Sequence, residues 1–332
     1  MQLSSVRDLK RELYEPLAPL QGLQAQQVPA VSVPAERMVD VARIQPGIAL
    51  GVGAGSRLGD YRLAVRIQHR DLIGSSKLAA IEKSAHGEVD VQYIGELTKL
   101  EASSGESARV RPARPGTSIG HYAITAGTLG AFVRVDGSDQ PRILSNNHVL
   151  ADENRGSTGD EILQPGVFDG GKAGADRIGT LERFVALDPS SVNDVDAALA
   201  ILDEQIEFDP TLEAISTSRQ LADIEKVQQV IKRGRTTQLT RGAVTAIEVD
   251  NVVVRFSTGQ MRFDGQIEIA SPDAGGFSRG GDSGSLIVDE PSGDAVGLVF
   301  AGSDQGGAHG SGVSYGNPLA VVFDRLRIGG LW

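Results

Sequence analysis

The chain has 332 residues, of which 40% are hydrophobic and 23% charged, and its formal net charge is -11. This composition is that of an ordinary globular protein, and its acidic surface disfavours a nucleic-acid partner. The absence of cysteine excludes disulfides, thiolate metal sites and cysteine-protease chemistry. The 41 glycines, set among short apolar runs, favour a mainly β body with many tight turns.

The first hundred residues predict a small α+β domain. Residues 4–14 have apolar side chains at helical spacing, whereas residues 15–45 are rich in Pro, Gln and Ala and predict an extended or loosely packed segment. The elements expected next are strand, strand, helix and strand, at residues 47–52, 61–68, 75–87 and 89–97. We therefore assign residues 1–100 to an N-terminal α+β domain with a leading helix.

The amino-terminal segment does not look like a secretory signal. It carries charges every few residues and lacks the apolar core of about seven or more residues that such a signal needs. No stretch of the sequence approaches the roughly 20 apolar residues of a membrane span. We therefore expect a cytoplasmic protein without a membrane partner.

The remainder of the chain has a different character. Residues 101–117 mix Ser, Gly, Pro and Arg without a sustained period and predict a linker. From residue 118 onward, short apolar runs alternate with Gly, Pro, Asp and Asn, which predicts a sandwich or barrel over residues 118–332. One helix is expected at residues 217–229.

The clearest local signal is the sequence GGDSGS at residues 280–285. A nucleophilic serine needs an exposed hydroxyl and nearby backbone N–H groups that stabilise an oxyanion. Flanking glycines let the backbone come close to a substrate. Ser283 is therefore the candidate nucleophile, and the candidate oxyanion hole consists of Gly281, Asp282 and Ser283. The structural alternative is an ordinary glycine-rich turn.

Two further motifs supply candidate partners for this serine. His148 follows an apolar strand and the polar pair Asn146 and Asn147, and an ordinary histidine pKa of about 6.5 suits a general base. Asp196 opens an apolar run, so it would be buried, and a hydrogen bond to the second histidine nitrogen would compensate that burial. Asp194 is a rival for this role. A core histidine and a turn aspartate are the structural alternatives.

The order His, Asp, Ser along the chain is that of chymotrypsin-type enzymes and differs from subtilisins and α/β-hydrolases. Over residues 118–328 the chain resembles the trypsin-like serine peptidases of chymotrypsin fold. The sequences SNNHVLA, DAAL and GGDSGS are similar to their histidine, aspartate and serine motifs, and AVGLVFAG is similar to their substrate-binding strand. The surrounding residues are closer to the bacterial and plant cytoplasmic members, which include the NAL1-like proteins.

The resemblance implies a mainly β fold with two six-stranded antiparallel β-barrels and a site in the cleft between them. It implies His148 as general base, Asp196 as its orienting partner and Ser283 as nucleophile, with no cofactor and no metal. The substrate-binding residues that it implies are Phe277, Phe300, Ala301 and Gly302. Phe277 stands where trypsin has an acid, so the resemblance does not imply cleavage after Arg or Lys. Asp304 and His309 are alternative lining residues for the pocket.

Activation is a separate question. Secreted members of the family complete their oxyanion hole when cleavage frees a new N-terminus, which pairs with the aspartate before the serine. No cleavage motif precedes the barrel region here, so we expect a ready-formed site or one controlled by the N-terminal domain. The linker arginines Arg109, Arg111 and Arg114 are a candidate self-cleavage site, with a plain linker as the alternative.

Three other classes of protein are less compatible with the sequence. An inactive protease-like module that binds peptides predicts a broken set of His, Asp and Ser, yet all three are present. An α/β-hydrolase esterase would need a strand, nucleophile and helix elbow and the order Ser, Asp, His. A zinc enzyme is disfavoured because the five histidines are scattered and cysteine is absent. We therefore predict a serine endopeptidase that acts on a protein or peptide substrate.

Overall fold

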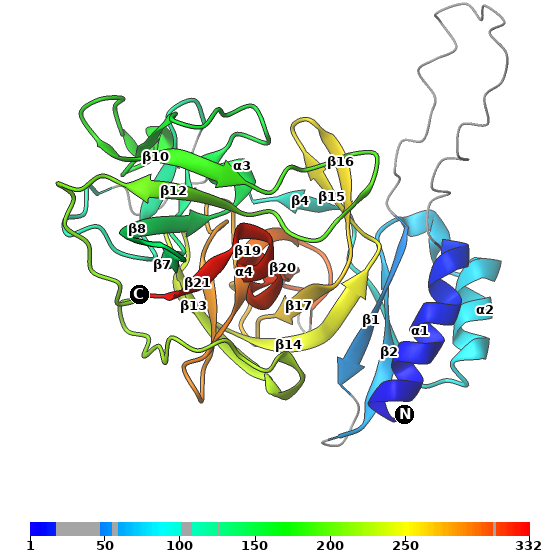
Figure 1. Ribbon diagram of the computed structural model, residues 1–332. Coiled ribbons are helices and arrows are strands. Elements are labelled where there is room, and N and C mark those ends of the chain that lie inside the picture. The colour runs from blue at the N-terminus through cyan, green and yellow to red at the C-terminus, as the bar shows by residue number, and fades with distance from the viewer. Residues whose placement is uncertain (18–46, 55–58, 101–107, 125, 308–309) are drawn as a thin grey trace, which may run out of the picture.

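The computed structural model describes residues 1–17, 47–54, 59–100, 108–124, 126–307 and 310–332. Most of the segment expected to be extended at residues 15–45 therefore lies outside the described residues. The predicted mainly β architecture is confirmed, with two large sheets and a small α+β unit at the N-terminal end (Figure 1).

Of the two sheets, the one that comes second along residues 118–332 is the larger. Six of its strands close into an antiparallel barrel, because β18 pairs back with β13. The strands in ring order are β13 (Gln229–Gly234), β14 (Gln238–Asp250), β17 (Gln266–Ala270), β20 (Val313–Pro318), β19 (Ala295–Ser303) and β18 (Leu286–Asp289). The loop that contains Ser283 leads directly into β18. The closed barrel therefore fixes the base of that loop.

The first sheet is an open path of eight antiparallel strands, whereas the resemblance implies a closed barrel of six. In sheet order they are β21 (Ile328–Leu331), β7 (Ala131–Val135), β8 (Ser138–Ser145), β12 (Ala198–Leu202), β10 (Arg177–Phe184), β9 (Glu161–Leu163), β5 (Ser118–His121) and β6 (Gly127–Thr128). The C-terminal strand β21 joins this sheet by pairing with β7, after the helix α4 (Leu319–Leu326) has left the second barrel.

A short strand from the N-terminal part enters the barrel sheet. The strand expected at residues 89–97 is split: β3 (Val89–Tyr93) ends before Gly95, which has a positive φ of 66°, and β4 (Leu97–Lys99) is a separate strand. β4 lies between β15 (Val252–Phe256), which it pairs with in parallel, and β19, which it pairs with antiparallel (Figure 1). The hairpin partner of β15 is β16 (Gly259–Phe263), which also pairs with β11 (Val192–Asn193).

The N-terminal unit has the predicted order of elements. These are α1 (Leu3–Leu17), β1 (Ile48–Ala54), β2 (Tyr61–Ile67), α2 (Ser76–Ser84) and β3. β1 pairs with β14 of the second barrel, so one sheet runs across both parts of the chain. The division into residues 1–100, 101–117 and 118–332 stays a prediction.

A buried ion pair also joins the N-terminal unit to the barrel. Arg66 on β2 is fully buried, and its guanidinium lies 2.8 Å from Glu268 on β17 and 2.8 Å from Asp90. The Tyr315 hydroxyl donates a hydrogen bond of 2.6 Å to Glu268. Buried charges are costly unless they are paired, so these contacts hold the unit in one position against the barrel.

Helices are few. The helix predicted at residues 217–229 is wrong: only the single turn η4 (Ile224–Lys226) forms, and β13 begins at Gln229. Ala222 N–H donates to the Ala295 carbonyl at 2.9 Å, so backbone pairing with β19 replaces the helix. The other single turns are η2 (Arg70–Leu72) and η3 (Val167–Asp169). Within the described ranges, none of the helices has the length and apolar character needed to cross a membrane.

Candidate functional site

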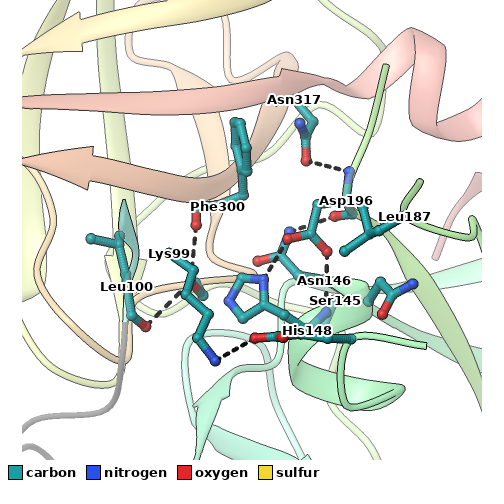
Figure 2. Close-up of polar contacts among 12 residues, drawn as sticks. Lys99, Leu100, Ser145, Asn146, His148, Leu187, Asp196, Phe300 and Asn317 are labelled. Atoms are coloured by element: carbon teal, nitrogen blue, oxygen red, sulfur yellow. Dashed lines mark hydrogen bonds and ion pairs between the residues drawn. The ribbon is translucent and has the colours of Figure 1, made fainter. Parts of the chain in front are cut away.

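His148 and Asp196 lie together at the ends of two paired strands of the first sheet. The short helix α3 (Asn147–Leu150) follows β8 and carries His148, while Asp196 precedes β12. Antiparallel pairing of β8 with β12 brings the two residues together, and Nδ1 of His148 is hydrogen-bonded to the Asp196 carboxylate (Figure 2). The other carboxylate oxygen accepts from the His148 backbone N–H at 3.1 Å.

Asp196 is fully buried, and both its backbone carbonyl and its backbone N–H are hydrogen-bonded to side chains. Asn146 donates its side-chain amide to the Asp196 carbonyl at 2.7 Å, and the Asp196 N–H donates to the Asn317 side chain at 3.1 Å (Figure 2). The rival Asp194 is instead partly exposed and pairs with Arg325 at 3.3 Å. The geometry therefore places Asp196, and not Asp194, beside the histidine.

Ser283 is brought close to the histidine helix by the short strand β6. Thr128 N–H donates to the Ser283 carbonyl at 2.7 Å, and a Cβ on the neighbouring Gly127 would meet both that carbonyl and the side chain of Val149. The Ser283 hydroxyl donates to the Phe300 carbonyl at 3.4 Å. Among the described residues, Nε2 of His148 has no hydrogen-bond partner, so its lone pair is unused.

The backbone beside Ser283 takes an unusual conformation. Gly281 has a positive φ of 97°, a conformation that favours glycine, and its N–H donates to the Leu100 carbonyl at 3.1 Å. The Asp282 N–H instead donates to the Arg279 carbonyl at 2.9 Å within a turn. Asp282 was included among the candidate donors, but its N–H is engaged there, which leaves Gly281 and Ser283.

The Asp282 side chain holds this loop in place through hydrogen bonds and an ion pair. It is fully buried, and its carboxylate accepts from Thr236 N–H at 2.9 Å, from Thr237 N–H at 3.1 Å and from the Thr237 hydroxyl at 2.6 Å. The ammonium of Lys232 on β13 lies 3.2 Å away and is also fully buried. Burial lowers the pKa of Lys232, and the attraction of Asp282 opposes that shift.

The residues assigned to substrate binding surround β4. Ala301 pairs with Lys99 and Gly302 with Thr98, so the expected peptide-binding edge of β19 already carries a strand of the same chain. The Phe300 carbonyl faces the Ser283 hydroxyl. Phe277 is buried in an apolar cluster against which the Leu100 side chain packs.

A cleft of about 2000 Å³ lies beside β4. Its lining includes Thr98, Lys99, Leu100, Phe277 and Gly302. Asp304 also lines it, whereas His309 lies outside the described residues. His148, Asp196 and Ser283 are not among the described residues that line the cleft, and their exposed fractions are 6%, 0% and 0%. These three residues are therefore buried and lie outside the cleft lining, which includes residues of β4.

Lys232 and β4 were not identified from the sequence. A lysine within the apolar strand β13 is a signal that could have found Lys232, because a buried charge in a strand requires a partner. The three residues of β4 are too few to show a period, and their partners lie more than 150 positions away. No local signal could have placed them at the site.

No family model and no curated protein matches the chain. Similar solved structures include Thermobifida fusca protease A, with 17% identity and a TM-score of 0.44 over 66% of this chain and 99% of that one. A protease from Nocardiopsis has 18% identity and a TM-score of 0.44 over 66% and 100% of the two chains. A glutamic acid-specific serine protease has 18% identity and a TM-score of 0.45 over the same shares.

Proposed function

We propose that the protein is a serine endopeptidase with Ser283 as nucleophile, His148 as general base and Asp196 as the residue that orients the base. The observation that carries the proposal is the buried His148–Asp196 pair with an unpartnered Nε2, next to a loop with Ser283 and the Gly281 N–H donor. An unpartnered polar atom in a buried position is costly, and a role as proton acceptor accounts for it.

The chemistry is acyl transfer. Asp196 accepts a hydrogen bond from the Nδ1–H of His148, which keeps Nε2 deprotonated and available. Nε2 takes the proton of the Ser283 hydroxyl as its oxygen attacks a peptide carbonyl, and the N–H groups of Gly281 and Ser283 stabilise the resulting oxyanion. His148 then gives the proton to the leaving amine, and water hydrolyses the acyl-enzyme.

The buried pair of Lys232 and Asp282 supports a ready-formed oxyanion hole. In secreted members of the resembling family, a newly freed N-terminus supplies the cation for the equivalent aspartate. Here Lys232 supplies a cation from within β13, at 3.2 Å, so the loop does not depend on a freed amine. Lys232 is therefore a positioning residue in this proposal.

The substrate in this proposal is a peptide in extended conformation. Its backbone pairs with the edge of β19 in place of β4, and the buried Phe277 makes the specificity pocket apolar rather than acidic. A cytoplasmic location and membership of the bacterial and plant cytoplasmic group also belong to the proposal, and they rest on the sequence motifs.

Covalent labelling tests the assignment. Once β4 is displaced from β19, a fluorophosphonate probe is expected to modify Ser283, as located by mass spectrometry, and the label should be lost in Ser283→Ala and His148→Ala. Ser292→Ala removes an exposed serine whose hydrogen bonds are with Asp289 and Asp294, so this control variant should keep the label. Equal labelling of Ser283→Ala and the wild type would refute the proposal. A folded protein that binds peptides but never reacts would favour the inactive module.

A further inference from the structure

The strand β4 lies on β19 in the way that a bound peptide would. Lys99 pairs with Ala301 and Thr98 with Gly302 in antiparallel register, and β15 covers the opposite edge of β4. Strand addition to a free sheet edge is a general mode of peptide binding, in which main-chain hydrogen bonds hold the ligand. The chain therefore presents one of its own segments to its own site.

The carbonyl group of Leu100 lies at the reactive centre. Its oxygen accepts from the Gly281 N–H at 3.1 Å and lies 3.5 Å from the Ser283 hydroxyl oxygen. A substrate carbonyl makes the same two contacts, one to an oxyanion donor and one to the nucleophile, before attack. The peptide bond that this carbonyl carbon forms with the next residue is therefore the candidate scissile bond.

The Leu100 side chain fits the pocket beside it. It packs against an apolar cluster that includes Phe277 and Val299. Gly302 leaves room for it, since a Cβ at that position would lie 3.2 Å from Cδ2 of Leu100. The pocket therefore matches a branched aliphatic side chain before the scissile bond.

Lys99 adds a charged contact one residue earlier. Its ammonium lies 2.6 Å from Glu153, whose side chain is 1% exposed. The turn after β15 holds this carboxylate, because Ser257 N–H donates to it at 3.1 Å and Thr258 N–H at 3.0 Å. Glu153 is thus a fixed acid that selects a basic residue at this position.

We propose that the protein is its own substrate and that Ser283 cleaves the peptide bond between Leu100 and Glu101. The inference rests on the proposed endopeptidase function and adds its specificity, a leucine preceded by a lysine. Ser283 Oγ bonds to the Leu100 carbonyl carbon as His148 takes the hydroxyl proton. The bond to the Glu101 nitrogen then breaks, His148 protonates that amine, and water releases Leu100 as a carboxylate.

The two products remain associated. Residues 1–100 still hold β1 against β14 and Arg66 against Glu268 after the cut. The cleaved protein therefore consists of two fragments that remain bound to each other. The linker arginines are not the site of the cut: Arg111, for example, donates to the carbonyl of Gln164 rather than to any group near Ser283.

The test follows purified full-length protein by intact mass and N-terminal sequencing. Wild type is expected to yield fragments 1–100 and 101–332, with a new N-terminus at Glu101. The rate should be independent of protein concentration, because the reaction is intramolecular. Ser283→Ala should remain intact. Leu100→Asp should slow the cut at least a hundredfold, Leu100→Met should keep it, and Arg109→Ala should cut at the wild-type rate.

A second readout separates this inference from the proposed function. Leu100→Gly removes the side chain that fills the pocket, so the fluorophosphonate probe should label Ser283 in that variant. Labelling of Leu100→Gly together with a wild type that stays intact after prolonged incubation would overturn self-cleavage and leave the endopeptidase proposal standing. Absence of both labelling and cleavage would overturn the two together. A cut elsewhere, such as after Arg109, would overturn the inference alone.

Discussion

The ε-ammonium group of Lys232 lies 3.2 Å from the carboxylate of Asp282, and both side chains are fully buried. Breaking a buried ion pair by removing one partner leaves an uncompensated charge, which costs about 3–5 kcal/mol. We expect Lys232→Met to lower the free energy of unfolding by about that amount and to reduce probe labelling of Ser283. Urea unfolding and labelling rates measure both effects.

The double variant Lys232→Met/Asp282→Asn is the matched comparison. It removes both charges, so it should recover much of the stability that the single variant loses. A single variant as stable and as reactive as the wild type would show that the pair does not position the loop.

Asp196 and Asp194 offer a matched test of the histidine partner. Asp196→Asn keeps the shape of the side chain but stabilises the wrong histidine tautomer, and we expect activity to fall about ten-thousand-fold with little loss of structure. Asp194→Asn changes an exposed residue paired with Arg325 and should retain activity. Steady-state cleavage of a leucyl peptide and circular dichroism check both variants. Similar losses in the two variants would contradict the assignment.

Glu153 gives a prediction for how the stability of the protein depends on pH. Burial raises the pKa of Glu153, but hydrogen bonds from Lys99 and Ser257 outweigh burial and lower it from an ordinary 4.5 to about 2. A lowered folded-state pKa means that the contribution to stability is present above pH 4.5 and is lost as the pH falls toward 2. In the uncut Ser283→Ala background, the stability difference between Glu153 and Glu153→Gln should therefore shrink between pH 6 and pH 3.

The control for this pH series is Glu96→Gln. Glu96 and its partner Arg255 are about half exposed, so their pairing is screened by solvent and should contribute little at any pH. Urea unfolding at each pH provides the comparison. A Glu153→Gln difference that is constant with pH would rule out the buried contact with Lys99.

Gly302 gives a prediction for specificity. A methyl group there would lie 3.2 Å from Leu100 and 3.1 Å from the Val313 carbonyl, so Gly302→Ala narrows the pocket. We expect kcat/KM for a leucyl peptide to fall at least tenfold, while an alanyl peptide is affected less. Gly330→Ala, where a Cβ would meet nothing within 4 Å, should change neither value. Equal losses for both peptides would place the effect on folding rather than on the pocket.

The sequence motifs indicated His148, Asp196 and Ser283 as candidates because each has distinctive local neighbours, but only the geometry distinguishes Asp196 from its rival Asp194. Apolar runs likewise predicted β1, β2 and most barrel strands. The helix at 217–229 failed because its backbone pairs with β19, which no local pattern records. Asp282 N–H is engaged with Arg279, a detail of turn geometry that spacing cannot reveal. The position of β4 depends on partners far along the chain and could not be predicted.

The pairing of β1 with β14 has a consequence for competition at the site. It tethers β4 at an effective concentration set by the geometry of the chain, which for short connections is about millimolar. Dilution of the protein cannot lower that concentration, and a free peptide of equal intrinsic affinity must exceed it to displace β4. Because the tether survives the cut after Leu100, the new carboxyl end would remain a resident competitor, which a free peptide displaces only at a higher concentration or with a tighter intrinsic affinity.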